Sequence, residues 1–401
     1  MRAVMYGAGN IGRGFIGQLF AGSGYEVTFI DVAEKVIDTL NQEGRYPIRF
    51  ISNEGTRDVW VNGIRAINGN DREKATEAIA EADIMATAVG VRILPYIAPL
   101  IAEGIRKRFA RNERPLNIII CENLIEADKL MAKLIRENLN EEEQLLFEKR
   151  IGLVEASIGR MVPIQTAEMQ DGNLLRICCE EYGFLPVDRN AFRGEIPVIE
   201  GMAAFDNFAF FIERKLFIHN MGHSICAYLG MYLGDKYIYE AVNRAEILLI
   251  AQNAMTESAL ALSEKHKVPF ADLHKHIQDL LRRFSNRALG DTCARVGGDT
   301  ERKLGPHDRL IGAIRLCEEN AVTPVFISLG AAAALYRHLE EKNTPQGRDA
   351  AAKVLAELCT LPENSPGRDI VLSMYSIVSE PDASSIALPR LIQECFYHKP
   401  H

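Results

Sequence analysis

The chain has 401 residues, of which 47% are hydrophobic and 25% charged, and its formal net charge is −8. A chain of this length is expected to form two domains, and the composition is typical of a globular protein. The acidic balance gives no basis for binding nucleic acid or a membrane surface. No apolar run is long enough to predict a transmembrane helix. We therefore expect the partner of this protein to be a small molecule.

The first residues and the cysteines indicate where the protein works. A strand-like segment, Met1–Tyr6, starts the chain and leaves no room for a signal peptide. The eight cysteines are scattered and form no Cys-x-x-Cys pair, which disfavours zinc ribbons and thioredoxin-like chemistry. Reduced, mostly buried thiols in the cytoplasm are the simplest interpretation.

The first 31 residues have the order of a dinucleotide-binding unit. Directly after the apolar strand Met1–Tyr6 comes the glycine-rich segment Gly7–Gly12, then a helix-like stretch over residues 13–21. A second strand, Val27–Ile30, ends in the acid Asp31. Strand, glycine turn, helix, second strand and terminal acid are the parts of the Rossmann fingerprint. The sequence therefore predicts a Rossmann-type domain that binds a dinucleotide.

Each glycine of this turn has its own predicted role. Gly7 allows the tight turn, Gly9 lets the backbone approach a pyrophosphate, and Gly12 lets the helix pack closely on the strand. Asp31 lies 19 residues beyond Gly12, where a carboxylate accepts both ribose hydroxyls and repels a 2′-phosphate. The expected cofactor is therefore NAD rather than NADP, and the expected cofactor residues here are Gly7, Ala8, Gly9, Asn10, Ile11, Gly12 and Asp31.

The next ninety residues continue to alternate between helices and strands. Helices are expected near residues 32–43, 73–81 and 93–107, and strands near 45–61, 84–89 and 116–120. This alternation predicts a doubly wound parallel sheet, in which ligands bind at the carboxyl ends of the strands. Residues at two of those ends are further candidates for the cofactor and substrate site, and they are Thr87, Val89, Gly90 and Asn123.

The second half of the chain has a different character. Further strand-like runs fall within residues 151–184, but helical periodicity dominates from about Ile199, as in residues 239–264 and 325–339. The stretch rich in Pro, Asp and Arg at residues 185–197 is the best boundary. We therefore expect an α/β protein, with an NAD-binding Rossmann-type domain and β extension at 1–195 and a mainly α-helical catalytic domain at 196–401.

A candidate catalytic group opens the helical half. Lys215, Asn220 and His223 stand at i, i+5 and i+8. On an ideal α-helix, at about 100° per residue, Asn220 points ~140° and His223 ~80° away from Lys215. Such a fan along ~12 Å of helix suits an extended, hydroxylated substrate. The flanking apolar residues favour a neutral lysine, able to take the proton of a secondary alcohol while a hydride leaves the same carbon.

The remaining polar groups complete this interpretation. Asn220 can donate a hydrogen bond to the alkoxide-like oxygen, and Asn123 can donate a second one, so the reaction requires no metal. The spacing of these residues is also compatible with two other interpretations. Lys215 and His223 also fit an ordinary amphipathic helix, with a solvated lysine and a core histidine. His219 and His223 at i, i+4 fit a metal site, although no third ligand stands nearby.

The chain resembles the polyol-specific long-chain dehydrogenase/reductase family along nearly its whole length. The resemblance is carried by residues 7–17, 87–90, 117–123, 213–228 and 302–310. In that family a K-x4-N-x2-H motif supplies a lysine base, an asparagine and a histidine without zinc. The resemblance assigns these roles to Lys215, Asn220 and His223, and a second oxyanion donor to Asn123. It implies an NAD-dependent enzyme interconverting mannitol 1-phosphate and fructose 6-phosphate, as a monomer or small homo-oligomer.

Two departures from the family pattern bear on the substrate. The family shows an acid where this chain has Gly159, so its role passes to Glu155 or is absent. Relatives carry a basic residue where this chain has Gly298, which weakens the case for a phosphate. The remaining candidate phosphate ligands are Arg302, Lys303 and Arg309, which equally fit local ion pairs.

These departures leave alternatives to the expected activity. One is a dehydrogenase for a free polyol such as mannitol, and another is a reductase for a hexuronate related to fructuronate or tagaturonate. A third is a protein that binds NAD and a sugar phosphate without turnover, against which the intact Lys215, Asn220 and His223 argue.

Overall fold

The computed structural model describes residues 1–380 and 387–397, which fall into two compact units, Met1–Phe211 and Ile212–His401. The sequence interpretation places the division earlier, between residues 195 and 196. That position lies between β10 (Leu185–Asp188) and β11 (Met202–Phe205), which pair in parallel. This pairing keeps residues up to β11 in the first unit.

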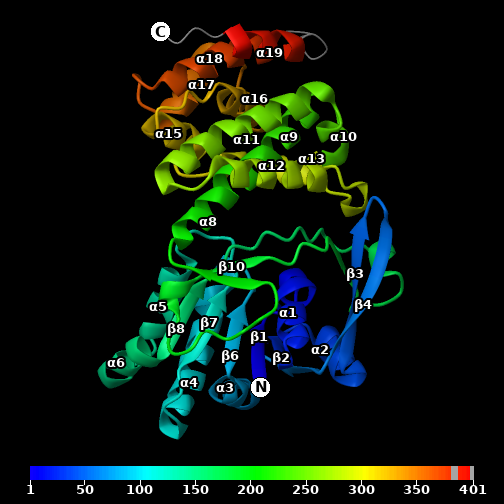
Figure 1. The fold of residues 1–401 in the computed structure, drawn as a ribbon, viewed down its shortest axis with the longest axis vertical. Helices are drawn as coiled ribbons and strands as arrows, with labels where there is room; N and C mark the ends of the chain where they lie inside the picture. The colour runs from blue at the N-terminus through cyan, green and yellow to red at the C-terminus, as the bar shows by residue number, and fades with distance from the viewer. Residues whose placement is uncertain (381–386, 398–401) are drawn as a thin grey trace. The chain divides into compact units, whose positions relative to one another are not determined.

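The first unit is built on a six-stranded parallel sheet with the strand order β5-β2-β1-β6-β7-β8 (Figure 1). The chain runs outward from β1 to β2 and β5, and then returns to start β6 on the other side of β1. This reversal creates the topological switch point at which open α/β sheets bind their ligands. The strands are β1 (Arg2–Tyr6), β2 (Glu26–Asp31), β5 (Ile64–Asn68), β6 (Ile84–Thr87), β7 (Leu116–Ile120) and β8 (Ile151–Glu155).

Helices cover both faces of this sheet, as the doubly wound prediction requires. Successive residues of β1 enter different cores, because side chains alternate across a strand. Ala3 and Met5 belong to one core, whereas Val4 and Tyr6 belong to the other. The Rossmann-type fold expected from the sequence is therefore confirmed. The helices are α1 (Gly17–Gly22), α2 (Glu34–Glu43), α3 (Arg72–Glu81), α4 (Leu94–Arg111), α5 (Ala127–Arg136) and α6 (Glu141–Arg150).

A smaller sheet forms the β extension of this unit. The antiparallel hairpin of β3 (Arg45–Ser52) and β4 (Gly55–Asn62) stands as a long arm beside α2 in Figure 1. β9 (Ile177–Cys179) joins β3 in parallel. The short helix α7 (Ala167–Gln170) lies in the segment before β9, and α8 (Phe208–Arg214) crosses the division between the units.

The second unit is helical throughout its described residues. Its centre contains α9 (Met221–Tyr232), α11 (Ala245–His266) and α16 (Val325–Glu341), which pack on one another at glycines. A Cβ on Gly330 of α16 would lie 2.4 Å from the Cγ1 of Ile225 on α9. The other helices are α10 (Ile238–Val242), α12 (Phe270–Phe284), α13 (Cys293–Gly297), α14 (Thr300–Lys303), α15 (Ile311–Glu319), α17 (Arg348–Glu357), α18 (Pro366–Val378) and α19 (Ala387–Tyr397).

Three elements differ from the sequence expectation. The strand β11 falls where helical structure was expected, because β10 offers it a parallel partner. The strand β5 lies beyond the β-like segment expected at 45–61 and pairs with β2. The helix expected at 239–264 is broken between α10 and α11 at Asn243 and Arg244, where Arg244 forms a bidentate ion pair with Asp235.

Two general expectations can be compared with the described residues. All eight cysteines are buried and unpaired, as expected of structural thiols. None of the helices described in residues 1–380 and 387–397 combines the length and apolar character needed to cross a membrane.

Candidate functional site

The glycine-rich turn after β1 has little room for any side chain at two of its three glycines. Gly7 has a φ of +103°, and a Cβ there would lie 2.6 Å from the carbonyl oxygen of Ala88. A Cβ on Gly12 would lie 1.9 Å from the carbonyl oxygen of Gly7. Gly9 differs, since a Cβ there would meet no atom within 4 Å. The turn is therefore closed by contacts at Gly7 and Gly12 and leaves open space at Gly9.

The helix that follows contains a π-helical turn, Gly12–Ile16, directly before α1. Tyr46 contacts this turn by donating its hydroxyl to the carbonyl oxygen of Arg13 at 2.8 Å. The buried Arg13 side chain braces the glycine turn, because its Nε donates to the carbonyl of Ala8 at 2.6 Å. Its Nη1 donates to the carbonyl of Leu175, also at 2.6 Å. Sequence reasoning missed this arginine, which stands directly after the glycine motif.

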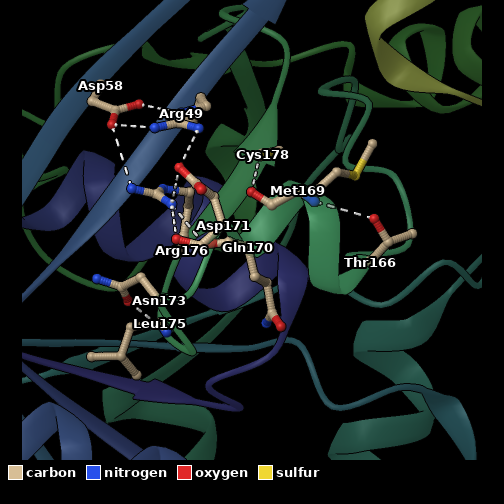
Figure 2. Close-up of polar contacts among 10 residues, drawn as sticks. All are labelled: Arg49, Asp58, Thr166, Met169, Gln170, Asp171, Asn173, Leu175, Arg176 and Cys178. Carbon is tan, nitrogen blue, oxygen red and sulfur yellow. Dashed lines mark hydrogen bonds and ion pairs between the residues drawn. The ribbon is translucent and has the colours of Figure 1, made fainter.

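A network of charged side chains holds the segment that supports Arg13 (Figure 2). Arg49 on β3 makes a bidentate pair with Asp58 on β4 and reaches Asp171 at 3.3 Å. Arg176 bonds the carboxylate of Asp171 at 3.2 Å and donates to its carbonyl. These contacts tie residues 170–176, including Leu175, to the hairpin. The β extension therefore supports the glycine turn through the contact of Leu175 with Arg13.

Asp31, at the end of β2, is held by backbone N–H groups on both carboxylate oxygens. Its Oδ2 accepts from Ala8 at 2.6 Å, and its Oδ1 accepts from Val32 at 2.7 Å and Ala33 at 3.0 Å. Oδ1 uses both of its lone pairs in these bonds, whereas Oδ2 uses only one, so Oδ2 is able to accept a ribose hydroxyl as well. Asp31 and the glycine turn thus form one connected group.

The loops at the ends of β6 and β7 are joined by Glu122. Its Oε2 accepts the hydroxyl of Thr87 at 2.8 Å, and its Oε1 accepts the N–H of Val89 at 3.2 Å. Burial raises the pKa of Glu122, and these hydrogen bonds partly offset that effect. Glu122 thereby fixes the Thr87–Gly90 loop and the position from which the exposed Asn123 projects. Sequence reasoning gave Glu122 no role, although it stands directly before Asn123.

The departure at Gly159 has a local explanation. A Cβ at this position would lie 2.9 Å from the Cε1 of Tyr182, so an aspartate does not fit without movement. The adjacent Arg160 is buried and donates to the carbonyl of Gly14 at 2.7 Å. Asn10 also reaches this segment, since its amide donates to the carbonyl of Pro163 at 3.2 Å. Residues 159–163 therefore brace the glycine turn.

Glu155, the alternative acid, lies at the end of β8. Its Oε1 accepts the N–H of Glu126 at 3.1 Å, just before α5. Burial, and secondarily the charge of Asp128, raise the pKa of Glu155 to about 7. This carboxyl group therefore holds the segment that connects β7 to α5.

In the second unit, Lys215 and Asn220 bound a π-helical segment, Lys215–Asn220, between α8 and α9. Backbone hydrogen bonds of a π-helix run from i to i+5, so these two residues lie one turn apart on the same face. The expected ~140° separation, taken from an ideal α-helix, is therefore wrong. His223 follows three residues after Asn220 in α geometry and so neighbours it on that face. The half-buried Asn220 side chain has no hydrogen-bond partner among the described residues.

Of the two histidines of this segment, His219 is buried and His223 is partly buried, and they have different neighbours. His223 Nε2 lies 3.3 Å from Oδ2 of Asp291, and the His223 ring stacks on Phe284 with centroids 4.6 Å apart. His219 packs against Phe284 at 5.6 Å. Burial lowers the pKa of both histidines. No group of three or more His, Cys, Asp or Glu side chains suited to a metal ion occurs in residues 1–380 and 387–397.

The three basic candidates for phosphate binding differ in how they are engaged. Lys303 is buried and donates to the carbonyls of Val296 and Gly298 at the end of α13, and burial lowers its pKa to about 8. Arg302 makes ion pairs with Asp299 and Asp308. Arg309 bonds Asp308 through Nε alone. Its two Nη groups have no hydrogen-bond partner in the described part of the chain, so Arg309 retains free donors for an anion.

Comparisons with known proteins agree with both halves of this arrangement. A family model described as the mannitol dehydrogenase Rossmann domain matches residues 1–201, and one for the mannitol dehydrogenase C-terminal domain matches residues 207–374. The mannitol-1-phosphate 5-dehydrogenase of Brevibacillus brevis is 40% identical over 335 residues, covering 84% of this chain and 86% of the relative. That of Shouchella clausii is 38% identical over 355 residues, covering 88% and 92%.

Solved structures show the same fold at low identity. Pseudomonas fluorescens mannitol 2-dehydrogenase, in a ternary complex with NAD and D-mannitol, superposes with a TM-score of 0.77 at 15% identity, over 98% of this chain and 94% of that one. A substrate-free D-sorbitol dehydrogenase reaches a TM-score of 0.82, also at 15% identity, over 97% and 95%.

Proposed function

The chain belongs to the mannitol dehydrogenase family, and we propose that it is an NAD-dependent enzyme interconverting mannitol 1-phosphate and fructose 6-phosphate. The observation that carries this proposal is the 40% identity to a mannitol-1-phosphate 5-dehydrogenase over most of both chains. The three catalytic candidates on one face of the Lys215–Asn220 turn and α9 are consistent with it.

The first unit fits NAD by its own geometry. The turn keeps open space over Gly9, where a pyrophosphate requires close approach of the backbone. The N-terminus of the following helix provides N–H groups for the phosphates, and Asp31 offers its carboxylate to the ribose. Bound NAD would supply the hydride acceptor. We propose Thr87, Val89 and Gly90 as further residues of this cofactor site.

The second unit supplies the proton chemistry in this proposal. Lys215 Nζ takes the proton of the substrate hydroxyl as the carbon–hydrogen bond is lost as hydride, which leaves a ketone. Asn220 donates a hydrogen bond to the oxygen on which negative charge develops, and Asn123 is the second donor. His223 binds a neighbouring hydroxyl. This division of roles requires no metal ion.

Arg309 is the favoured phosphate ligand among the basic candidates. Its Nη groups present the planar pair of donors that recognises a phosphate, whereas Lys303 and Arg302 are engaged by carbonyl and carboxylate groups. We further propose a cytoplasmic location, consistent with eight buried free thiols, and a monomer or small homo-oligomer.

The test is the absorbance of NADH at 340 nm when purified protein meets NAD with mannitol 1-phosphate, and with mannitol in parallel. A rise that is much faster with the phosphate supports the proposal. A rise with mannitol alone would instead assign a free polyol. The Lys215→Ala variant is expected to lose 10²–10⁴-fold in rate with NAD affinity unchanged. Lys236→Ala, which removes an exposed lysine of the same unit, serves as its control.

A further inference from the structure

His223 is held on its edge and on its face by two side chains from other elements. Asp291 approaches the ring edge, with Oδ2 3.3 Å from Nε2. Phe284, the last residue of α12, stacks on the ring face at an interplanar angle of 10°. The opposite ring nitrogen, Nδ1, has no hydrogen-bond partner among the described residues. The ring is therefore fixed in orientation while one of its two nitrogens stays available.

Two backbone hydrogen bonds hold the segment that carries Asp291 in place. The carbonyl of Asp291 accepts the N–H of Ile238 at 2.9 Å, and the N–H of Cys293 bonds the carbonyl of Lys236 at 2.9 Å. The side chain of Arg295, four residues later, donates from Nε and Nη2 to the two carboxylate oxygens of Asp291, each at 2.6 Å. Backbone and side chain thus place this carboxylate independently of any substrate.

Charge and burial together define the protonation of this pair. Burial alone would raise the pKa of Asp291, but the hydrogen bond with His223 and the charge of Arg295 lower it, so the carboxylate stays ionised. Burial lowers the pKa of His223 despite the neighbouring carboxylate, so the ring is neutral near pH 7. A neutral imidazole carries one N–H, and an ionised carboxylate is an acceptor only. The ring proton therefore belongs on Nε2, facing Asp291, and Nδ1 carries a lone pair.

We propose that Asp291 is a positioning residue that fixes His223 as the neutral Nε2–H tautomer, so that Nδ1 accepts a hydrogen bond from a hydroxyl of the polyol substrate. This inference rests on the proposed function for the identity of the ligand. It adds a directional requirement, because the bound substrate has to present an O–H donor to this nitrogen. A ligand lacking a hydroxyl at that carbon leaves the lone pair unpaired, and so binds more weakly.

The test combines a spectroscopic and a kinetic measurement on Asp291→Asn. An asparagine keeps the shape of the side chain. With its oxygen on Arg295 Nε, its NH2 group replaces Oδ2, loses the bond from Arg295 Nη2 and is able to donate to Nε2 of His223. The aspartate-to-asparagine change of a serine protease triad gives the wrong tautomer in the same way. Nitrogen NMR of the full-length protein with labelled histidine reports which ring nitrogen is protonated. The His223 signals are identified by their loss in His223→Gln.

The expected result is a protonated Nε2 and an unprotonated Nδ1 in the wild type, with a shift toward Nδ1–H in Asp291→Asn. The KM for the sugar alcohol substrate should rise about tenfold, the loss of one hydrogen bond, while NADH affinity stays unchanged. Asp235→Asn is the matched control, since Asp235 also makes a bidentate pair with an arginine, Arg244, in the same unit. It should change neither measurement.

A wild type with Nδ1–H, or an Asp291→Asn variant with an unchanged tautomer, would overturn the inference. The NMR measurement needs no turnover, so it decides the state of the pair even if the enzyme acts on none of the tested polyols. Absence of turnover on every tested polyol would contradict the proposed function, whereas the NMR result alone decides whether Asp291 sets the tautomer of His223.

Discussion

The carboxylate of Asp31 accepts the backbone N–H of Ala8 at 2.6 Å, which ties the acid that ends β2 to the turn that follows β1. The second carboxylate oxygen is held by the N–H groups of Val32 and Ala33. Asp31 is therefore oriented by the protein itself, before any ribose is bound. A substitution at this position has two effects, one on the cofactor and one on the turn.

Asp31→Asn separates these effects in part, because its single amide oxygen still accepts the N–H of Ala8, while its NH2 group cannot accept those of Val32 and Ala33 and the negative charge is lost. We expect the preference for NAD over NADP, measured as a ratio of kcat/KM values, to fall about ten- to hundredfold. The melting temperature should fall by less than in Asp31→Ala, which loses all three hydrogen bonds. Asp31→Ala should show the same loss of preference together with a lower melting temperature. An Asp31→Asn variant with undiminished preference for NAD would contradict the assigned role.

The parts of the fold that were predicted well depend on local patterns. The glycine turn follows from φ at Gly7 and from contact between Gly7 and Gly12, both set within a few residues. The parts that were missed depend on distant partners. β11 is a strand because residues 185–188 lie beside it, and no periodicity within residues 199–205 shows this.

The same distinction explains the candidate site. The identities of Lys215, Asn220 and His223 could be read from the sequence, but their arrangement could not, since an ideal α-helical period does not reveal a π-helical turn. Asp291 was missed as well, because it lies 68 residues after His223 and meets it only through the packing of α9 against the segment before α13. The three basic residues looked equivalent until their different partners were known.

Arg309→Gln tests the origin of selectivity for a phosphorylated substrate. The loss of two η-nitrogen donors should raise the KM for mannitol 1-phosphate about ten- to hundredfold, with much less effect on any activity toward mannitol. Arg302→Gln is the matched control, since Arg302 is half-exposed and already paired with two carboxylates. Equal effects of the two variants would show that Arg309 has no special role in binding the phosphate.

Gly9→Ala and Gly12→Ala should affect different properties, cofactor binding and folding stability respectively, although the two positions lie only three residues apart. The Cβ at position 12 would overlap the carbonyl oxygen of Gly7, so this variant should lose at least about 1–3 kcal/mol of folding free energy. The Cβ at position 9 meets no protein atom but occupies the space assigned to the pyrophosphate. Gly9→Ala should therefore melt normally and bind NADH at least tenfold more weakly in a fluorescence titration. Normal NADH binding by Gly9→Ala would remove Gly9 from the cofactor site.

Glu155 gives the first unit a predictable pH dependence of stability. Burial raises its pKa from an ordinary value of 4.5 to about 7 in the folded protein. Between these values the folded state binds more protons than the unfolded state, so this residue makes stability fall as the pH rises through that window. Glu155→Gln cannot titrate, yet its amide oxygen still accepts the N–H of Glu126. Relative to the wild type, the variant should gain about 1–2 kcal/mol between pH 5 and pH 8, a value reduced for the partial solvent exposure of this carboxyl group. Urea unfolding of both proteins at pH 5, 6, 7 and 8 measures this difference, and a constant difference across the series would show that Glu155 is already ionised at pH 5.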